Sequence, residues 1–285
     1  MSSFKIRTDL ALEARENMDD AAEECRGVSV EEEYDQKSEI RITRVVIETK
    51  NGAKAMGKPI GTYITLEAPA MALPDEDYHQ EIAGELARQL RRIIPGLEGE
   101  QSVMVVGLGN RDVTADALGP NVVDNLIITR HMVKEYGKAA YNQNRIHMIS
   151  GLIPGVMAKT GMESQEIIKG VVEQTKPDVV VVIDALAARS TKSLNRTIQV
   201  TNTGIHPGSG VGNNRNAITK EALGVPVIAI GVPTVVDAAT IVNDALERMM
   251  RQAGEEPIKL KEELWHSLGA VSYTHLRAHE TPEHL

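Results

Sequence analysis

The sequence predicts an α/β protein with a doubly wound, mainly parallel sheet flanked by helices, together with an N-terminal antiparallel β layer. Apolar runs without alternation, at 102–106 and 179–183, are typical of strands covered on both faces. A segment with one apolar helical face precedes each of these runs, at 75–92 and at 163–175. Strands that alternate with helices favour a parallel sheet.

The residues before this core predict the antiparallel layer. Residues 40–47 and 61–67 are β-rich runs, and Asn51-Gly52 between them favours a tight hairpin turn. Residues 10–24 have helical spacing but a high density of acidic side chains, which indicates a solvated helix or an acidic surface.

The sequence from residue 75 onward predicts alternating helices and strands. Acidic residues begin the helix at 75–92 and arginines end it, as the helix dipole favours. Gly119-Pro120 opens the next helix, which is expected to reach about Gly137. The other elements are expected at 146–149 (strand), 163–175 (helix), 179–183, 197–203 and 226–231 (strands), and 237–252 (helix, with Asp237 as its N-cap).

Composition excludes several classes of protein. The net charge is −9, and residues 9–35 hold eleven acidic against two basic side chains, so the rest of the chain is close to neutral. Only 3% of residues are aromatic, so a stacking surface for nucleic acid is not expected. One cysteine, Cys25, fits a reducing compartment. No apolar stretch has the length of a membrane span, and we expect a cytoplasmic protein.

Two aspartates are the main candidates for chemistry. Asp184 follows the run 179–183 and Asp116 lies in the loop after 102–106, so both are expected at the carboxyl edge of the sheet. Two close carboxylates share a proton and can act as acid and base on a water molecule that attacks a peptide carbonyl. The alternative is that Asp116 caps the helix at Gly119 and Asp184 caps the turn that follows it.

Two glycine-rich stretches accompany these aspartates. Gly107-Leu108-Gly109-Asn110 turns the chain after the first core strand, and Asp112 in place of a third glycine disfavours a dinucleotide site. The loop 204–213 either presents amide groups to an oxyanion or a peptide, or is a flexible surface loop. The candidates for substrate or oxyanion binding are Gly109, Asn110, His206 and Ser209.

Six long stretches stand out and are, in chain order, RITRVVIE, VVGLGNRDVTADALGP, LIPGVMAKTGMES, VVIDALAARS, NTGIHPGSGVGNNR and PVIAIGVPTVVDA. These stretches resemble the germination proteases, the spore endopeptidases of endospore-forming bacteria, and the likeness runs from about Arg7 to Glu255. The resemblance is specific because several long motifs occur in the family's order. It implies an atypical aspartic-type peptidase with an α/β fold similar to that of hydrogenase-maturation endopeptidases.

The resemblance implies further properties. The family's two essential aspartates match Asp116 in TADALGP and Asp184 in IDALAARS. Family members degrade small acid-soluble spore proteins during germination, assemble as tetramers, and lose an N-terminal pro-segment by self-cleavage. The matching processing site is RTDLA, at Asp9 and Leu10. No cofactor, metal, nucleic-acid partner or membrane is implied, and the expected location is the cytoplasm of the spore core.

These observations divide the chain into five segments. Residues 1–9 are expected to be the pro-segment, and residues 10–74 the acidic and β-rich N-terminal region. Residues 75–254 are expected to form the α/β catalytic core, and residues 255–270 to begin a truncated C-terminal region. Residues 271–285 lack a periodic core pattern and are expected to be a non-native tail.

The residues leave three functions open. The leading hypothesis is a self-activating endopeptidase that uses Asp116 and Asp184. In a metal-dependent maturation endopeptidase, the same carboxylates and His206 would hold a divalent ion. A third possibility is a non-enzymatic α/β module that binds a nucleotide or a partner.

Overall fold

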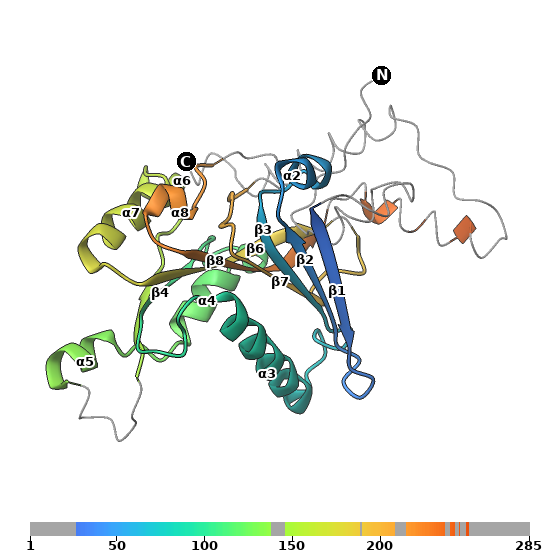
Figure 1. Ribbon diagram of the computed structural model, residues 1–285, viewed down its shortest axis with the longest axis horizontal. Coiled ribbons are helices and arrows are strands. Elements are labelled where there is room, and N and C mark those ends of the chain that lie inside the picture. Colours follow the sequence, from blue (N-terminus) through green and yellow to red (C-terminus); the bar gives the residue numbers. More distant parts are fainter. Residues whose placement is uncertain are drawn as a thin grey trace.

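A single sheet with helices on both faces forms the part of the chain that the computed structural model describes, namely residues 27–137, 146–188, 190–208, 215–236, 240–242, 245 and 249–250 (Figure 1). The strands are β1 (Val28–Tyr34), β2 (Arg41–Ile47), β3 (Gly61–Glu67), β4 (Ser102–Gly107), β5 (Met148–Leu152), β6 (Val179–Ala188), β7 (Thr197–Thr201) and β8 (Val227–Val236). The helices are α2 (Lys50–Met56), α3 (Glu76–Ile93), α4 (Leu118–Asp124), α5 (Arg130–Tyr136), α6 (Met157–Thr160), α7 (Ser164–Thr175) and α8 (Lys220–Leu223), with a 3-10 turn, η2 (Thr114–Asp116).

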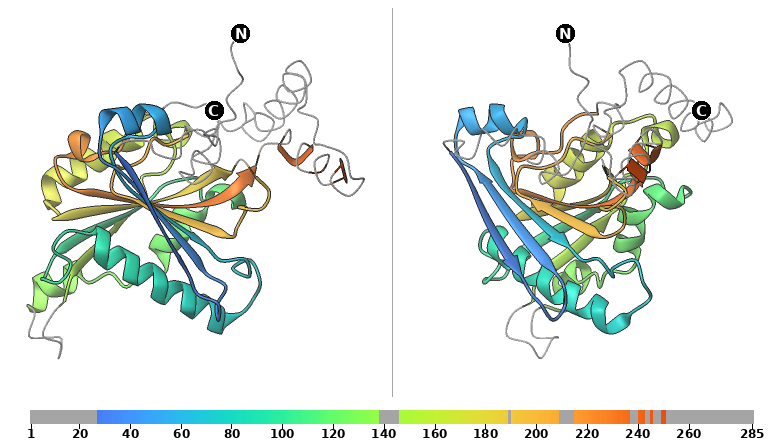
Figure 2. Two further views of the ribbon diagram at one scale, coloured as in Figure 1. Left: turned by 45° about the vertical axis from the view of Figure 1, so that its right-hand side comes forward. Right: turned by 90° about the vertical axis from the view of Figure 1, so that its right-hand side faces the viewer.

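The sheet is mixed, with the strand order β1-β2-β3-β7-β8-β6-β4-β5. Strands β8, β6, β4 and β5 run parallel, whereas β1, β2, β3 and β7 join by antiparallel pairs. The α/β class is therefore confirmed, but the sheet is not mainly parallel. The reason is β7, which returns beside β8 in the opposite direction and pairs with β3, so the N-terminal strands continue the same sheet. The sheet twists strongly along its width (Figure 2).

Strand β6 shows how the core is built on both faces of the sheet. Val179, Val181 and Ile183 pack in one cluster with residues of α3 and α4. The alternate residues Val180 and Val182 pack in a second cluster with residues of α7 and α8. A strand covered on both sides needs apolar side chains at every position, which explains the unbroken run in the sequence. In Figure 1, α3 and α4 accordingly lie on the opposite side of the sheet from α7 and α8.

The bounds of α3 and α7 agree with those predicted from the sequence to within one residue. Helix α3 begins after Asp75, whose carboxylate accepts the amide of Tyr78 at 3.1 Å, and arginines occupy its last turn. Helix α7 begins after Glu163, which forms a capping box with Glu166. Among the described residues, no helix has the length and apolar character to cross a membrane.

The turn expected at Asn51-Gly52 is wrong, because these residues lie inside α2. The Thr49 hydroxyl accepts the amide of Gly52 at 3.1 Å and caps a helix there, so β2 and β3 are joined by a helix instead of a tight turn. Strand β1 was not anticipated, because the acidic run in its sequence, VSVEEEY, hides the strand pattern.

The single helix expected from Gly119 to Gly137 is also wrong. The chain leaves the helical path after Asp124 and starts again at Arg130 as α5. Between them, Thr129 exchanges hydrogen bonds with Ile149 of β5: its amide donates to the Ile149 carbonyl at 3.0 Å, and its hydroxyl accepts the Ile149 amide at 2.9 Å. This pairing with the edge strand holds the segment out of a helix.

Candidate active site

The carboxyl end of β4 is closely packed against β6 and the start of α4. The amide of Leu108 donates to the carbonyl of Ile183 at 2.8 Å. A Cβ atom on Gly119 would overlap the Leu108 carbonyl oxygen and would lie 2.6 Å from the Ile183 oxygen. Only glycine permits this approach, so the first turn of α4 rests directly on the backbone of both strands.

Asp116 is held at this edge by the turn that follows β4. It is half-buried in η2, and its Oδ2 accepts the backbone amide of Asn110 at 2.7 Å. Gly109, with φ of +111°, lets the Asp116 carbonyl approach so closely that a Cβ there would overlap it. The helix-cap alternative for Asp116 is wrong, because α4 follows Ala117 and has no side-chain cap. The glycine turn therefore allows the loop after β4 to pack closely against the backbone of Asp116.

Asp184 lies within β6 and does not end it, contrary to expectation. Strand β4 pairs with β6 only as far as Gly107 opposite Ile183, whereas β8 continues to pair with β6 as far as Ala188. Asp184 is thus the first residue of β6 beyond its pairing with β4. It is 8% exposed, which is rare for an acidic side chain, and its Oδ1 accepts the amide of Ala185 at 2.9 Å. The alternative of a capped turn is wrong here, because extended strand follows.

The structure brings these two aspartates to one edge of the sheet. Asp184 directly follows Ile183, the residue that accepts the Leu108 amide, and the turn η2 that carries Asp116 contacts both β6 and β8. Each carboxylate accepts a hydrogen bond from a nearby backbone amide, Asp116 from Asn110 and Asp184 from Ala185, and these bonds orient the two groups. The edge therefore offers two ordered carboxylates, while their chemical role stays a prediction.

Helix α6 borders the same edge. Lys159 forms an ion pair with Asp112, in the loop between β4 and η2. Arg215 reaches this helix from another direction, because its Nη1 donates to the sulfur of Met157 at 3.1 Å and lies 3.7 Å from Glu163 Oε1. The exposed pair of Lys159 and Asp112 contributes little to stability, but it places α6 beside the loop that precedes Asp116.

Of the other predicted site residues, Gly109 and Asn110 contact Asp116, whereas His206 lies elsewhere. The amide of Asn110 is already bonded to Asp116. His206 is exposed and follows β7, which leaves the sheet beside Ala229, toward the amino ends of the parallel strands. The residues that the structure describes contain no group of three or more His, Cys, Asp or Glu side chains placed to hold a metal. Asp116, Asp184 and His206 therefore do not form such a cluster.

Several sequence predictions lie outside the described residues. They are the processing site at Asp9 and Leu10, the candidate Ser209, Cys25, Asp237 and the segment 271–285.

Sequence reasoning missed Thr234, which belongs to β8. Its hydroxyl donates to the carbonyl oxygen of Ala115 in η2 at 2.6 Å. The available signal was Pro233, because a proline inside an apolar run indicates a strand edge or a bulge.

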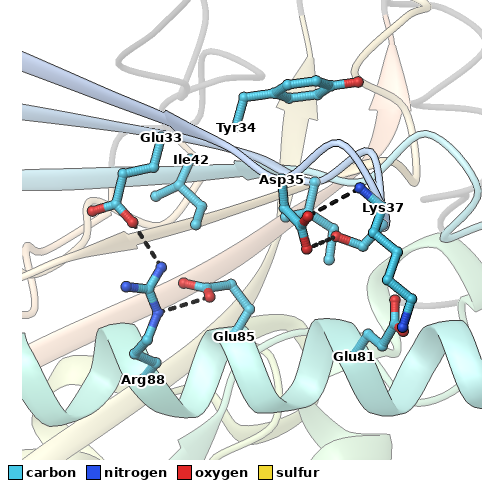
Figure 3. Close-up of a pocket in the computed structure, with 10 residues that line it drawn as sticks. Glu33, Tyr34, Asp35, Lys37, Ile42, Glu81, Glu85 and Arg88 are labelled. Atoms are coloured by element: carbon cyan, nitrogen blue, oxygen red, sulfur yellow. Dashed lines mark hydrogen bonds and ion pairs between the residues drawn. The ribbon is translucent and has the colours of Figure 1, made fainter.

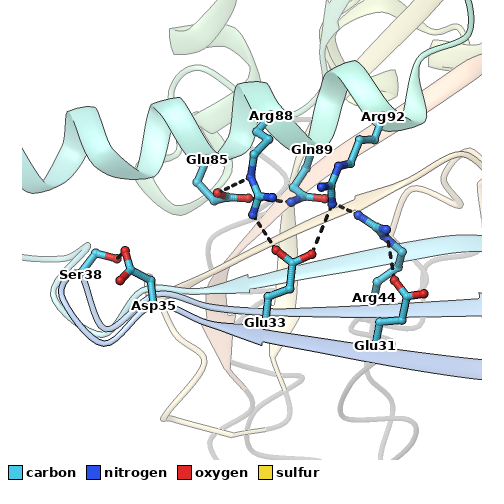
Figure 4. A network of polar contacts seen from close by, with 9 residues as sticks. All are labelled: Glu31, Glu33, Asp35, Ser38, Arg44, Glu85, Arg88, Gln89 and Arg92. Atoms are coloured by element: carbon cyan, nitrogen blue, oxygen red, sulfur yellow. Dashed lines mark hydrogen bonds and ion pairs between the residues drawn. The ribbon is translucent and has the colours of Figure 1, made fainter.

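A second polar cluster lies between α3 and the first two strands, β1 and β2. A cavity of about 410 Å³ separates α3 from the end of β1, and Glu33, Asp35, Glu85 and Arg88 are among its lining residues (Figure 3). Beside it lies a connected set that we call the arginine network (Figure 4). Its members are Glu31, Glu33, Arg44, Glu85, Arg88, Gln89 and Arg92.

Contacts within the arginine network neutralise its carboxylates. Arg88 donates to Glu33 and to Glu85, each at 2.8 Å. The hydrogen bond from Arg88 is the main cause that holds the pKa of Glu33 below its ordinary value, and Arg92 adds to it. Gln89 is fully buried and bonds to both Glu85 and Arg44. We interpret this cluster as a structural joint between α3 and the strands.

Comparison with known proteins identifies the family. The family model described as germination protease matches residues 6–284. A germination protease of Caldanaerobacter subterraneus subsp. tengcongensis is 52% identical over 254 residues, covering 89% of this chain and 76% of that protein. Germination proteases of Bacillus mycoides and Bacillus cereus (strain AH187) are 42% and 43% identical over 260 residues, covering 90% of this chain and 70% of each relative. The chain therefore belongs to the germination protease family.

Proposed function

We propose that this spore germination endopeptidase cleaves peptide bonds with Asp116 and Asp184 as paired carboxylates, in an aspartic-type reaction. The observation that supports the proposal is that the turn η2, which carries Asp116, contacts β6, which carries Asp184, at the edge where β4 ends. One of them, Asp184, is buried to 8% exposure. We propose that the pair carries one proton, because two carboxylates that lie close together, one of them buried, do not readily ionise together.

One proton on the pair provides an acid and a base together. The ionised carboxylate takes a proton from water while the water oxygen bonds to the carbonyl carbon of the peptide. The protonated carboxyl group gives its proton to the carbonyl oxygen, which yields a neutral tetrahedral intermediate. When the carbon–nitrogen bond breaks, that oxygen returns its proton to the pair and the amine leaves with the proton taken from water. The pair then holds one proton again.

The test replaces each carboxylate with an amide of the same shape in the full chain. Asp116→Asn and Asp184→Asn should each reduce cleavage of a purified small acid-soluble spore protein by about 10²-fold or more, because an amide cannot exchange the proton. Cleavage is followed by gel or mass spectrometry, and folding by circular dichroism. Wild-type cleavage by either variant would refute the proposal.

A matched control lies at the opposite end of the same two strands. Asp178 precedes β6, and its Oδ2 accepts the amide of Ser102, the first residue of β4, at 2.7 Å. It therefore resembles the candidate aspartates in its bonding, but it lies at the amino edge of the sheet. Asp178→Asn should lose some stability and keep the wild-type turnover. Equal loss of activity in all three variants would indicate a general effect on folding.

The remaining properties are proposed from the family resemblance. We propose that small acid-soluble spore proteins are the substrates, that the enzyme is a tetramer in the spore core, and that residues 1–9 form an inhibitory pro-segment removed at Asp9 and Leu10. A chain that begins at Leu10 should then cleave substrate faster than the full chain in the same assay. Equal initial rates would reject inhibition by the segment, and size-exclusion chromatography with light scattering tests the tetramer.

A further inference from the structure

Strand β8 contains a bulge beside the candidate active site. Leu186 of β6 pairs with Pro233, and the next residue, Ala187, pairs with Val235, so Thr234 has no partner in the ladder. Pro233 has no amide hydrogen to donate, which favours an interruption of the pairing at this point. The amide of Asn195 donates to the Pro233 carbonyl at 2.8 Å and fixes the bulge from the side of β7. Bulges bend a strand and redirect a side chain, and they are common beside active sites.

The bulge directs its extra residue to the turn that carries Asp116. The Thr234 hydroxyl donates to the carbonyl oxygen of Ala115 at 2.6 Å, across a separation of 119 residues in the sequence. Ala115 is the middle residue of η2, and Asp116 follows it directly. The start of η2 has no side-chain cap. The bond from β8 therefore ties a short turn, which has few hydrogen bonds of its own, to the sheet.

Asp116 is consequently fixed from two sides. Its carboxylate accepts the Asn110 amide at 2.7 Å, on the side of β4. Its backbone is tied through Ala115 to β8, on the far side of β6. Because β6 lies between β4 and β8 and carries Asp184, the two bonds set the turn against the strand that holds the second carboxylate.

We infer that Thr234 is a positioning residue for Asp116, and this inference rests on the proposed function. Thr234 acts through the Ala115 carbonyl, so its loss should change the geometry of the two carboxylates and leave the remaining surface for the substrate intact. A displacement of about 1 Å in a catalytic group can reduce a rate by about 10²-fold. The expected effect therefore falls on kcat and not on KM.

The test uses three variants of the full chain. Thr234→Val removes the hydroxyl and keeps the branched shape, and it should lower kcat for a purified small acid-soluble spore protein about 10-fold or more, with KM within about 2-fold. Thr234→Ser keeps the hydroxyl and should restore most of the rate. Thr234→Ala serves as a second hydroxyl-free variant if valine strains the bulge.

The control variant is Thr175→Val. Thr175 is also half-buried, and its hydroxyl donates to the carbonyl of Val171 at 2.7 Å, at the end of α7. The chemical change is the same, but the site lies outside the candidate active site. Turnover should stay at the wild-type value, and an equal fall in kcat would show that the Thr234 effect is not specific.

Hydrogen exchange separates this inference from the proposed function. Amides of residues 110–117 should exchange faster in Thr234→Val than in the wild-type or Thr175→Val chains, because the turn has lost its bond to the sheet. A wild-type kcat in Thr234→Val overturns the inference, with or without faster exchange. If Asp116→Asn is inactive in the same assay, the proposed function survives that result. Wild-type activity in Asp116→Asn would instead remove the proposed function itself.

Discussion

Two regions of this protein gather carboxylates, and they hold them with different donors. In the arginine network, Glu33 and Glu85 each accept a charged guanidinium hydrogen bond from Arg88. At the carboxyl edge of β4 and β6, Asp116 accepts a hydrogen bond from the backbone amide of Asn110, and Asp184 accepts one from the backbone amide of Ala185. A guanidinium cancels the charge of its partner, whereas a backbone amide orients a carboxylate and carries no net charge.

The backbone differs between the two regions as strongly as the charges do. The candidate site depends on direct contact between main-chain segments, as at Gly119 on Leu108 and Ile183. In the arginine network, long side chains bridge α3 and the strands (Figure 4). The edge is therefore sensitive to small changes in the backbone, whereas the network can adapt because long side chains can move.

The largest effect is expected when a methyl group is added at Gly119. Gly119→Ala would place a Cβ against the backbone of Leu108 and 2.6 Å from the Ile183 oxygen, and main-chain atoms cannot move aside. We expect a loss of more than about 3 kcal/mol in the free energy of unfolding, at the upper end for overpacking. Urea unfolding followed by circular dichroism measures it.

The same substitution in the other region provides the control. Gly84 is exposed in α3, and a Cβ there meets no atom within 4 Å. Gly84→Ala should raise the free energy of unfolding by about 0.5–1 kcal/mol, because alanine favours a helix interior over glycine. Equal effects of the two substitutions would contradict the contrast between the regions.

The smallest expected effect is a dependence of stability on pH in the arginine network. The pKa of Glu33 is lowered, chiefly by the Arg88 hydrogen bond. The stabilisation should therefore be complete above the unfolded-state pKa, near 4.5, and should disappear as the pH falls through the lower pKa of the folded state. Because the Glu33 side chain is 45% exposed, the contribution should remain below about 1 kcal/mol.

The measurement compares wild type with Glu33→Gln in urea between about pH 7 and about pH 3. The difference in the free energy of unfolding should be constant near neutrality and should approach zero in acid. Added salt should reduce it at neutral pH, since exposed charges are screened. A difference that grows in acid would show that Glu33 is not stabilised as an anion.

Local sequence patterns were enough to locate most of the core elements and to single out Asp116 and Asp184 as candidates. Asp116 and Asp184 were identified because acidic residues after buried apolar runs fall near a sheet edge. Helices α3 and α7 were predicted nearly to the residue, because their caps and apolar faces are local patterns. Strand β6 was recognised from its unbroken apolar run, because a strand that is covered on both faces does not alternate apolar and polar side chains.

The pairing of the strands and the surroundings of each aspartate depend on segments that are distant in the sequence, so they became visible in the folded chain. The antiparallel return of β7, which joins the N-terminal strands to the sheet, depends on partners far apart in the chain. The extension of β6 beyond Asp184 depends on β8, and the bond from Thr234 to Ala115 links residues 119 positions apart. Periodicity records the environment of a residue along its own element, but it does not record which distant segment supplies that environment.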